Sequence, residues 1–315
     1  MTREIEHRFV VDPRLAGSRL DVVLAQELGV SRAEARRLLG RGGVRLGARP
    51  VGLAEKGEPV HAGAELVVTA WTPPEDRAPE PDPDAPLRVL DEGSGWVAVD
   101  KPAGTPVHPL APGEGGTVLN ALVARRPGVL GVGEGGLRCG VLHRLDVGTS
   151  GVLLFATDDV HWKRLRHAFR THRVAKTYRA VVAGALAGSG EERVRLAVTR
   201  PRPARVRVVA EHDDAEGGGP GRPTRLRWRA LQPLEGATLV EVDLGTGFLH
   251  QIRAVFAHRG HPVAGDEAYG GPDLGVASRP LLHASRLAWE EIDVAAPDPE
   301  DLRAAVARLE PGPGA

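Results

Sequence analysis

The stretch His143-Arg-Leu-Asp-Val-Gly-Thr-Ser-Gly151 decides how the rest of the chain is interpreted. It places the carboxylate of Asp146 between the cationic Arg144 and a turn of small residues. The apolar run 152–156, which follows at once, predicts a buried strand. A carboxylate beside an arginine, at the edge of a rigid sheet, is suited to nucleophilic or electrostatic work on a sugar or base. An Arg-Leu-Asp triplet alone is more often a surface ion pair beside a turn.

The longer stretch resembles the signature His-Arg-Leu-Asp-x-x-Thr-Ser-Gly of the large-subunit-type pseudouridine synthases, whose aspartate is catalytic. Further motifs of that family follow in the same order. They are residues 174–184 with Lys176 and Tyr178, Thr246-Gly-Phe-Leu-His-Gln-Ile-Arg253, Gly265-Asp-Glu-Ala-Tyr-Gly270, and Leu282-His-Ala-Ser-Arg-Leu287. One departure is visible, because Phe248 stands where the family usually has arginine or a similar polar residue. It affects an expected phosphate contact and leaves the catalytic set intact.

The resemblance implies an isomerase that breaks the C1′–N1 bond of uridine, turns the base and rejoins it through C5. This rearrangement has no net redox change, so no metal or organic cofactor is expected. Asp146 is implied as the nucleophile or base at the ribose, with attack on C1′ and deprotonation at C2′ both open. Arg253 would pair with Asp146 and keep it ionised. Tyr178 would stack on the uracil, and its hydroxyl would serve in removing the C5 proton.

Five more residues complete the implied substrate site. Arg144 would insert where the extruded uridine leaves the RNA stack. Ile252 would exclude water from the ion pair. His143, Thr149 and Lys176 are expected to bind substrate through their places in the motifs. Without the motifs, an isoleucine or a strand tyrosine would be assigned to core packing.

Composition adds a charge asymmetry that the zero net charge conceals. Between 161 and 210, thirteen Lys or Arg residues stand against two acids, Glu191 and Glu192. Such a stretch fits a phosphate backbone, although a solvated helix face would look similar. The single Cys139 excludes an intrachain disulfide and favours a reducing cytoplasm. It has no second thiolate, and no histidine pair has ligand spacing, so no metal site is expected.

The chain is long enough for two domains, and residues 1–71 predict the first. Apolar spacing indicates a helix over 19–28, and Ser31 caps a second helix over 32–39. Short strands are expected at 44–46 and near 60–68. This pattern resembles the S4 RNA-binding domain, although Leu46-Gly-Ala48 replaces its usual Val-Asn-Gly. The resemblance implies that the second helix binds RNA through three arginines near one face, Arg32, Arg36 and Arg37.

The remaining boundaries follow from composition. Residues 72–86, rich in proline and acid, predict an extended spacer. Residues 87–295 predict a catalytic domain of α+β class, with the pseudouridine synthase fold and a large mixed, mainly antiparallel sheet. Within it, residues 213–223 predict a mobile loop. Residues 296–315 predict a tail with a short helical stretch and a disordered end.

We therefore expect a cytoplasmic RNA pseudouridine synthase that acts on large-subunit (23S) ribosomal RNA, with transfer RNA as the nearest alternative. Its partner would be RNA and not DNA or a membrane, since no signal peptide or membrane-spanning run is present. One cleft in one domain indicates a monomer. A non-catalytic RNA-binding or ribosome-assembly factor is another alternative, but it would not need Asp146, Tyr178 and Arg253 together. A glycoside hydrolase would need a second carboxylate about 5–10 Å from the first, and the motifs offer none.

Overall fold

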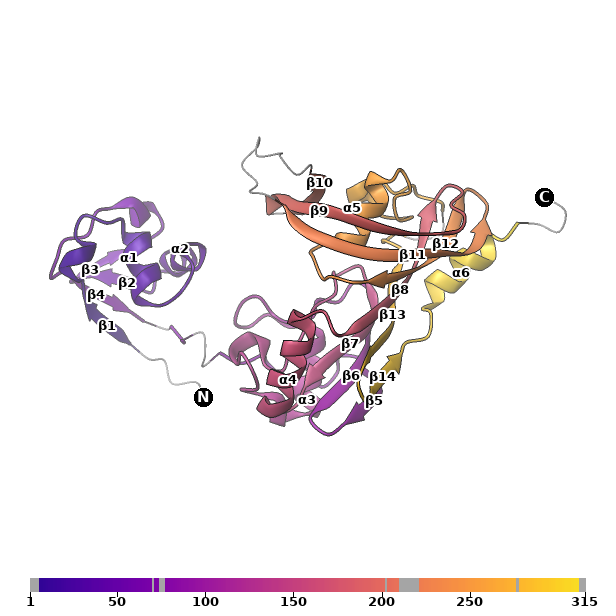
Figure 1. Ribbon diagram of the computed structural model, residues 1–315. Coiled ribbons are helices and arrows are strands. Elements are labelled where there is room, and N and C mark those ends of the chain that lie inside the picture. Colours follow the sequence, from indigo (N-terminus) through magenta and orange to yellow (C-terminus); the bar gives the residue numbers. More distant parts are fainter. Residues whose placement is uncertain are drawn as a thin grey trace. The chain divides into compact units, whose positions relative to one another are not determined.

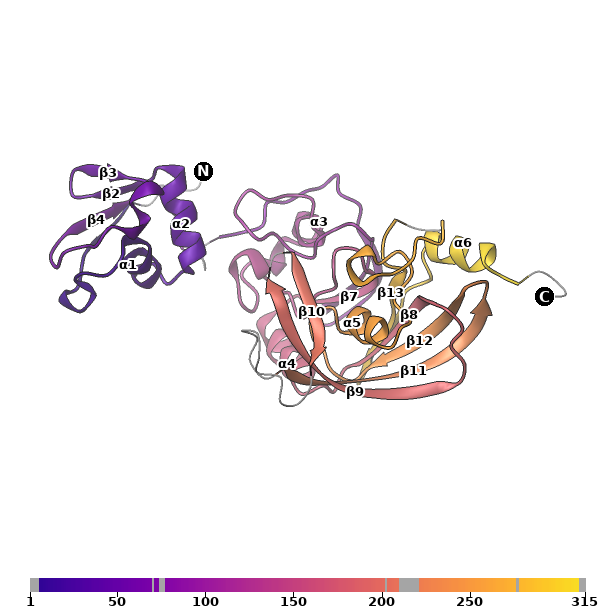
Figure 2. The ribbon, with the colours of Figure 1, turned by 90° about the horizontal axis from the view of Figure 1, so that it is seen from above.

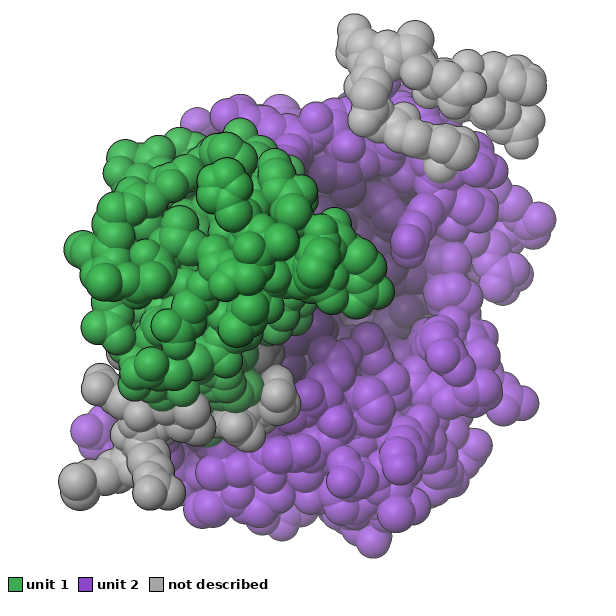
Figure 3. Space-filling model, turned by 90° about the vertical axis from the view of Figure 1, so that its left-hand side faces the viewer, with its two compact units in different colours: residues 1–78 green, residues 79–315 purple. Residues whose placement is uncertain are grey.

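The computed structural model describes residues 6–69, 71–73, 77–201, 203–209, 221–275 and 278–311. The chain forms two compact units, 1–78 and 79–315, which Figure 3 shows in different colours. Parts of three predicted segments lie outside the described residues. They are 74–76 of the spacer, 213–220 of the mobile loop and 312–315 of the tail.

Unit 1 is a pair of helices against a small antiparallel sheet (Figure 1). The helices are α1 (Leu20–Glu27) and α2 (Arg32–Arg41), close to the two predicted ranges. Ser31 caps α2 by accepting a hydrogen bond from Glu34 N at 3.2 Å, as its sequence position predicts. The sheet has the order β1 (His7–Val10), β4 (Glu65–Val68), β2 (Val44–Leu46), β3 (Arg49–Val51), with short 3-10 turns at Pro13–Leu15 and Ala54–Gly57.

One buried carboxylate joins the two helices of unit 1. Asp21, on α1, accepts hydrogen bonds from Arg19 Nε at 3.1 Å, Arg32 Nη2 at 3.2 Å and Arg36 Nε at 2.7 Å. Burial alone would raise the pKa of Asp21, but these three guanidinium groups lower it well below its ordinary value. Two of the three arginines expected to bind RNA are therefore already paired within the unit, with side chains 51% and 41% exposed. The third, Arg37, lies 4.0 Å from Glu34.

Unit 2 is built on a ten-stranded sheet of order β10-β9-β11-β12-β8-β13-β7-β6-β5, with β14 paired to β13. Only the β13–β7 pairing is parallel among the described strands, so the predicted α+β class with a mainly antiparallel sheet is confirmed. The strands are β5 (Arg88–Gly93), β6 (Trp96–Lys101), β7 (Ser150–Ala156), β8 (Ala175–Ala183), β9 (Ser189–Pro201), β10 (Ala204–Val209), β11 (Arg222–Leu234), β12 (Ala237–Leu244), β13 (Leu282–Trp289) and β14 (Ile292–Ala295).

Helices pack around this sheet. They are α3 (Val118–Arg125), α4 (Asp159–Arg170), α5 (Gln251–His258) and α6 (Glu300–Arg308), with 3-10 turns at Pro127–Val129, Gly136–Arg138 and Glu267–Tyr269. Strand β7 is buried throughout because its alternate side chains enter two different apolar clusters. Leu153 packs in the cluster that contains α3, and Leu154 in the cluster that contains α4. The curved strands β9, β11 and β12 enclose α5 on their concave side (Figure 2).

Two segments near the ends of unit 2 differ from expectation. Residues 79–86, predicted as part of an extended spacer, contact α3. Asn120 Nδ2 donates to Glu80 O at 2.7 Å, and Asp82 N donates to Asn120 O at 3.0 Å. In the predicted tail, α6 buries Leu302 in an apolar cluster with Val181 of β8. Both segments are therefore packed parts of unit 2. None of the helices in the described part of the chain is long and apolar enough to cross a membrane.

Candidate active site

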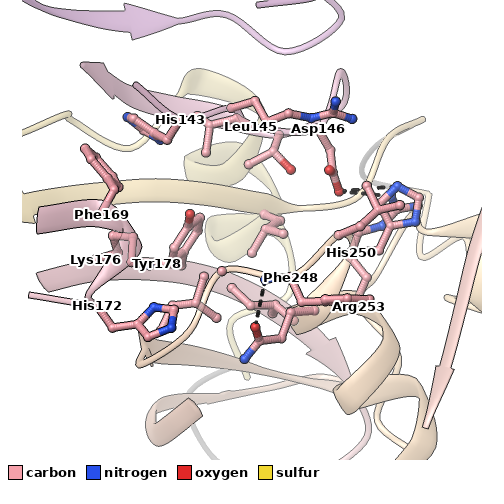
Figure 4. A pocket seen from close by; sticks show the side chains of 18 of the residues that line it. His143, Leu145, Asp146, Phe169, His172, Lys176, Tyr178, Phe248, His250 and Arg253 are labelled. Carbon is pink, nitrogen blue, oxygen red and sulfur yellow. Dashed lines mark hydrogen bonds and ion pairs between the residues drawn. The ribbon is translucent and has the colours of Figure 1, made fainter. Parts of the chain in front are cut away.

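A pocket of about 720 Å³ opens in unit 2 (Figure 4). Its wall comes from the loop before β7, the end of α4, the start of β8 and the turn that leads into α5. The structure brings together all of the residues predicted for catalysis and substrate binding, which are Asp146, Tyr178, Arg253, Arg144, His143, Ile252, Thr149 and Lys176. Arg32, Arg36 and Arg37 belong to unit 1 and do not line it.

Asp146 and Arg253 line the pocket and form a chain of ion pairs with Asp266, which lies behind Arg253 and outside the lining. Arg253, on the first turn of α5, donates from Nη1 to Asp146 Oδ2 at 3.2 Å. Its opposite edge donates to Asp266, from Nε at 2.6 Å and from Nη2 at 2.8 Å. Such a bidentate pair fixes the plane of a guanidinium group. Because the Asp266 side chain is only 1% exposed, it acts as an internal support that aims Arg253 at Asp146.

A histidine approaches the same carboxylate from the other side. His250 Nε2 lies 3.8 Å from Asp146 Oδ2, and its Nδ1 lies 2.9 Å from the Tyr269 hydroxyl. That hydroxyl accepts a hydrogen bond from Val206 N at 3.0 Å, which leaves its own hydrogen to donate to Nδ1. When the hydroxyl donates in this way, the hydrogen of the neutral imidazole is on Nε2 and faces Asp146. His250 reaches this position with φ of 51°, a left-handed conformation that is uncommon outside glycine.

Two cationic side chains that do not line the pocket, Lys101 and Arg279, bind the backbone of the loop that carries Asp146. The fully buried Lys101 donates to Val147 O at 3.0 Å and to Pro102 O at 2.9 Å. Arg279 donates to Gly148 O at 3.0 Å and makes a bidentate pair with Asp301 of α6, at 2.6 and 2.8 Å. The Lys101 side chain thus supports the loop without lining the pocket.

A glycine allows β7 to approach β13. Gly151 has φ of +115°, and a Cβ atom there would lie 2.2 Å from the carbonyl oxygen of Ala284. The last residue of the first motif is therefore required by the backbone, since no other side chain fits between the strands.

Burial controls the protonation of the remaining polar groups. It lowers the pKa of His143 to about 3, with the nearby charges of Lys176 and Arg166 acting in the same direction. The neutral ring accepts a hydrogen bond from Leu154 N at 3.0 Å through Nε2 and stacks on Phe169 with centroids 4.6 Å apart. Burial, reinforced by the charge of Asp146, raises the pKa of Tyr178 well above its ordinary value.

The pocket is strongly basic. Asp146 is the only carboxylate among the described residues that line it. The cationic lining residues are Arg144, Arg166, Arg170, Lys176, Arg222 and Arg253. Phe248, which replaces the usual polar residue of the family, also lines the pocket and packs against the apolar core. This balance favours a polyanionic substrate. It also argues against a two-carboxylate glycosidase, because Asp266 lies behind Arg253 and is occupied by it.

Sequence reasoning assigned no role to His250, Asp266 or Tyr269. All three lie inside quoted motifs, which was the available signal, but their partners depend on how two loops fold back on α5. In the described part of the chain, no group of three or more His, Cys, Asp or Glu side chains has the arrangement of a metal site.

Comparison with known proteins matches this geometry to one family. Residues 95–258 match the RNA pseudouridylate synthase family. The chain belongs to that family. The matched segment contains Asp146, Tyr178 and Arg253, and the protein is therefore an RNA pseudouridine synthase.

Other synthases are similar over nearly the whole chain. A Chloroflexus aurantiacus protein named as an uncharacterised RNA pseudouridine synthase is 36% identical over 98% of this chain and 95% of its own. The ribosomal large subunit pseudouridine synthase D of Xanthomonas campestris pv. campestris is 32% identical over 95% of this chain and 91% of its own. Among solved structures, human RNA pseudouridylate synthase domain containing 4 has the same fold at 20% identity, with a TM-score of 0.56 over 70% of this chain and 92% of its own.

Proposed function

We propose that this synthase converts specific uridines of large-subunit ribosomal RNA into pseudouridine, with Asp146 acting at the ribose. The observation that carries the proposal is the pairing of Asp146 with Arg253 at 3.2 Å in a basic pocket where no other described carboxylate is available. The choice of RNA is supported by relatives that span most of the chain and are named as ribosomal large subunit pseudouridine synthase D.

The reaction needs an ionised carboxylate at the sugar. Arg253 stabilises the charged form of Asp146, and Asp266 keeps the guanidinium group in place while the substrate changes. Because the guanidinium group is already fixed in place, it stabilises the charge that develops at the reacting centre and does not have to move during the reaction. Ile252, which is 4% exposed, lies next to Arg253 and keeps water from the ion pair. The carboxylate then attacks C1′ or removes the C2′ proton, and the glycosidic bond breaks.

The detached uracil must turn without leaving the pocket. Tyr178 provides a buried aromatic face for it, since a base can stack on any such ring. The target nucleotide must first leave the RNA stack to reach Asp146. The exposed Arg144 stands two residues before Asp146, where it would fill the vacated place.

The same proposal gives the other cations a role in RNA binding. Arg166 and Arg170 of α4, together with Arg222 of β11, would hold the phosphates around the extruded nucleotide. Unit 1 would act as an S4-like RNA-binding domain through Arg37 and the exposed parts of Arg32 and Arg36. We also propose that the enzyme acts in the cytoplasm, and that it acts as a monomer, since one cleft within unit 2 contains all of the proposed catalytic residues.

The test uses the C5 hydrogen that the isomerisation must release. Purified protein is incubated with ribosomal RNA, assembling large-subunit particles or transfer RNA, each carrying tritium at uracil C5, and tritium in water is counted. We expect release from ribosomal RNA or its particles with wild type and none with Asp146→Asn. Release from transfer RNA alone would replace the proposed substrate. Equal release with Asp146→Asn would remove the proposed role of this carboxylate.

A further inference from the structure

Lys176 is a polar group in the pocket that the steps above leave without a chemical role. It stands two residues before Tyr178 on β8, so both side chains leave the strand on the same face. Both line the pocket (Figure 4). Gly247 of the nearby turn lies beside the amine, since a Cβ atom on it would stand 3.7 Å from Nζ.

The amine of Lys176 has no partner that would hold its charge. Within the described part of the chain, Nζ makes no hydrogen bond and lies within 4.0 Å of no carboxylate. Burial lowers the pKa of Lys176 to about 8. The groups around it add no negative charge, because His143 is neutral and the other titratable lining residues nearby are His172, Arg166, Arg170 and Arg222.

The other lysine with a lowered pKa is differently placed. Lys101 donates two hydrogen bonds to carbonyl groups behind the catalytic loop, and it does not line the pocket. Lys176 therefore combines access to the substrate with an amine that is free to lose its proton.

The last chemical step requires such a base. After the base has rejoined the sugar through C5, that carbon carries both the new bond and its original hydrogen. Tyr178 is poorly suited to remove it, because burial keeps the phenol protonated. Asp146 acts on the sugar and is paired with Arg253. Two described pocket residues near the tyrosine then offer a basic nitrogen, His172 and Lys176. Lys176 is favoured because it leaves β8 on the same face as Tyr178, whereas His172 lies in the turn before that strand.

We propose that the neutral amine of Lys176 removes the C5 proton and thereby completes pseudouridine formation. The C5–H bond breaks and its electron pair forms the C5=C6 double bond. The electron pair of the C6=N1 bond moves to N1, which takes a proton from water. The new ammonium group of Lys176 returns its proton to solvent, so hydrogen from C5 appears in water and no oxidant or reductant is needed.

This inference rests on the proposed reaction, and the variants are chosen to separate the two. Lys176→Arg retains a cation that can hold a phosphate but cannot act as a base near neutral pH. Lys163→Arg is the matched control, because Lys163 is exposed on α4 and does not line the pocket. RNA affinity and single-turnover release of tritium or deuterium from C5 are measured for both variants and for wild type.

We expect Lys176→Arg to bind RNA within about threefold of wild type and to release C5 hydrogen about 10²–10⁴-fold more slowly. A primary isotope effect with C5-deuterated RNA should appear in this variant, because proton removal has become the slow step. In Lys176→Gly, ethylamine should restore release in proportion to its unprotonated concentration. Lys163→Arg should behave as wild type.

Release by Lys176→Arg within about threefold of wild type would overturn the proposal and leave Lys176 as a binding cation. A rate loss matched by an equal loss of RNA affinity, with no isotope effect and no rescue by ethylamine, would overturn it as well. If wild type itself released no C5 hydrogen from any RNA tested, the proposed function would fail first, and the role of Lys176 with it.

Discussion

Replacing Asp266 by asparagine removes one charge behind the catalytic pair and keeps the shape of the side chain. Asp266 is 1% exposed and Arg253 10%, and they share two bonds of 2.6 and 2.8 Å. An asparagine can accept only through one oxygen and turns its NH₂ group toward the guanidinium. Removing one partner of a buried ion pair destabilises a protein by about 3–5 kcal/mol. Because Arg253 retains Asp146 at 3.2 Å, we expect the lower value, about 3 kcal/mol.

A loss of about 3 kcal/mol in a unit of this size lowers Tm by about 6–12 °C. Arg253 would also lose its fixed orientation, and a displacement of about 1 Å costs about 10²-fold in rate. Thermal unfolding and single-turnover release of C5 tritium measure the two effects. The control is Asp293→Asn, which removes the same chemical pairing with Arg286 at an exposed site, with side chains 56% and 53% exposed. If Asp266→Asn lowered Tm no more than this control and kept full activity, the reasoning about Asp266 would be refuted.

Four further predictions concern other parts of the chain. Asp146→Asn should retain RNA binding and lose more than about 10²-fold in turnover, and turnover above about 1% would reject the assignment. Asp21→Asn should destabilise unit 1 by about 1–3 kcal/mol at neutral pH. The pKa of Asp21 is lower in the folded than in the unfolded chain, so its contribution to the free energy of unfolding is present above the unfolded pKa of about 4. That contribution is lost as pH falls toward the folded pKa. Urea titrations at several pH values should therefore show the stabilities of wild type and variant converging in acid. Arg37→Gln should reduce the slope of log K against log salt for RNA binding by about 1, and an unchanged slope would remove Arg37 from the interface. Gly151→Ala should lower Tm by several degrees because its Cβ would contact the Ala284 carbonyl, and a Tm equal to wild type would contradict that packing.

The catalytic pocket could be anticipated from the sequence because its residues sit in short motifs of fixed spacing. Asp146, Tyr178 and Arg253 lie on three separate segments, and the resemblance of their motifs to one family implied that they share a site, as the pocket shows. The role of Asp266 behind these residues could not be predicted from the sequence. The bidentate hold of Asp266 on Arg253 depends on a loop folding back onto α5, and local spacing carries no information on such a contact.

Charge counts were the weaker guide. The spacing of Arg32 and Arg36 on α2 indicated a free basic face, whereas both reach back to the buried Asp21 on the preceding helix. A carboxylate in the first turn of a helix is expected to face solvent, and only the position of the neighbouring helix shows that Asp21 is buried. Composition also gave a wrong prediction for residues 79–86, where the prolines indicated an extended spacer. The hydrogen bond from the Asn120 amide to Glu80 O holds this segment on α3, and composition carries no information on such a contact.

The hydrogen bonds and ion pair of Arg279 have a consequence for the chain while it is being synthesised. Arg279 ties Gly148, beside the catalytic aspartate, to Asp301 on α6. During synthesis the loop leaves the ribosome long before the helix that holds it. We therefore expect the nascent chain to be inactive until α6 has been translated and packed against the loop.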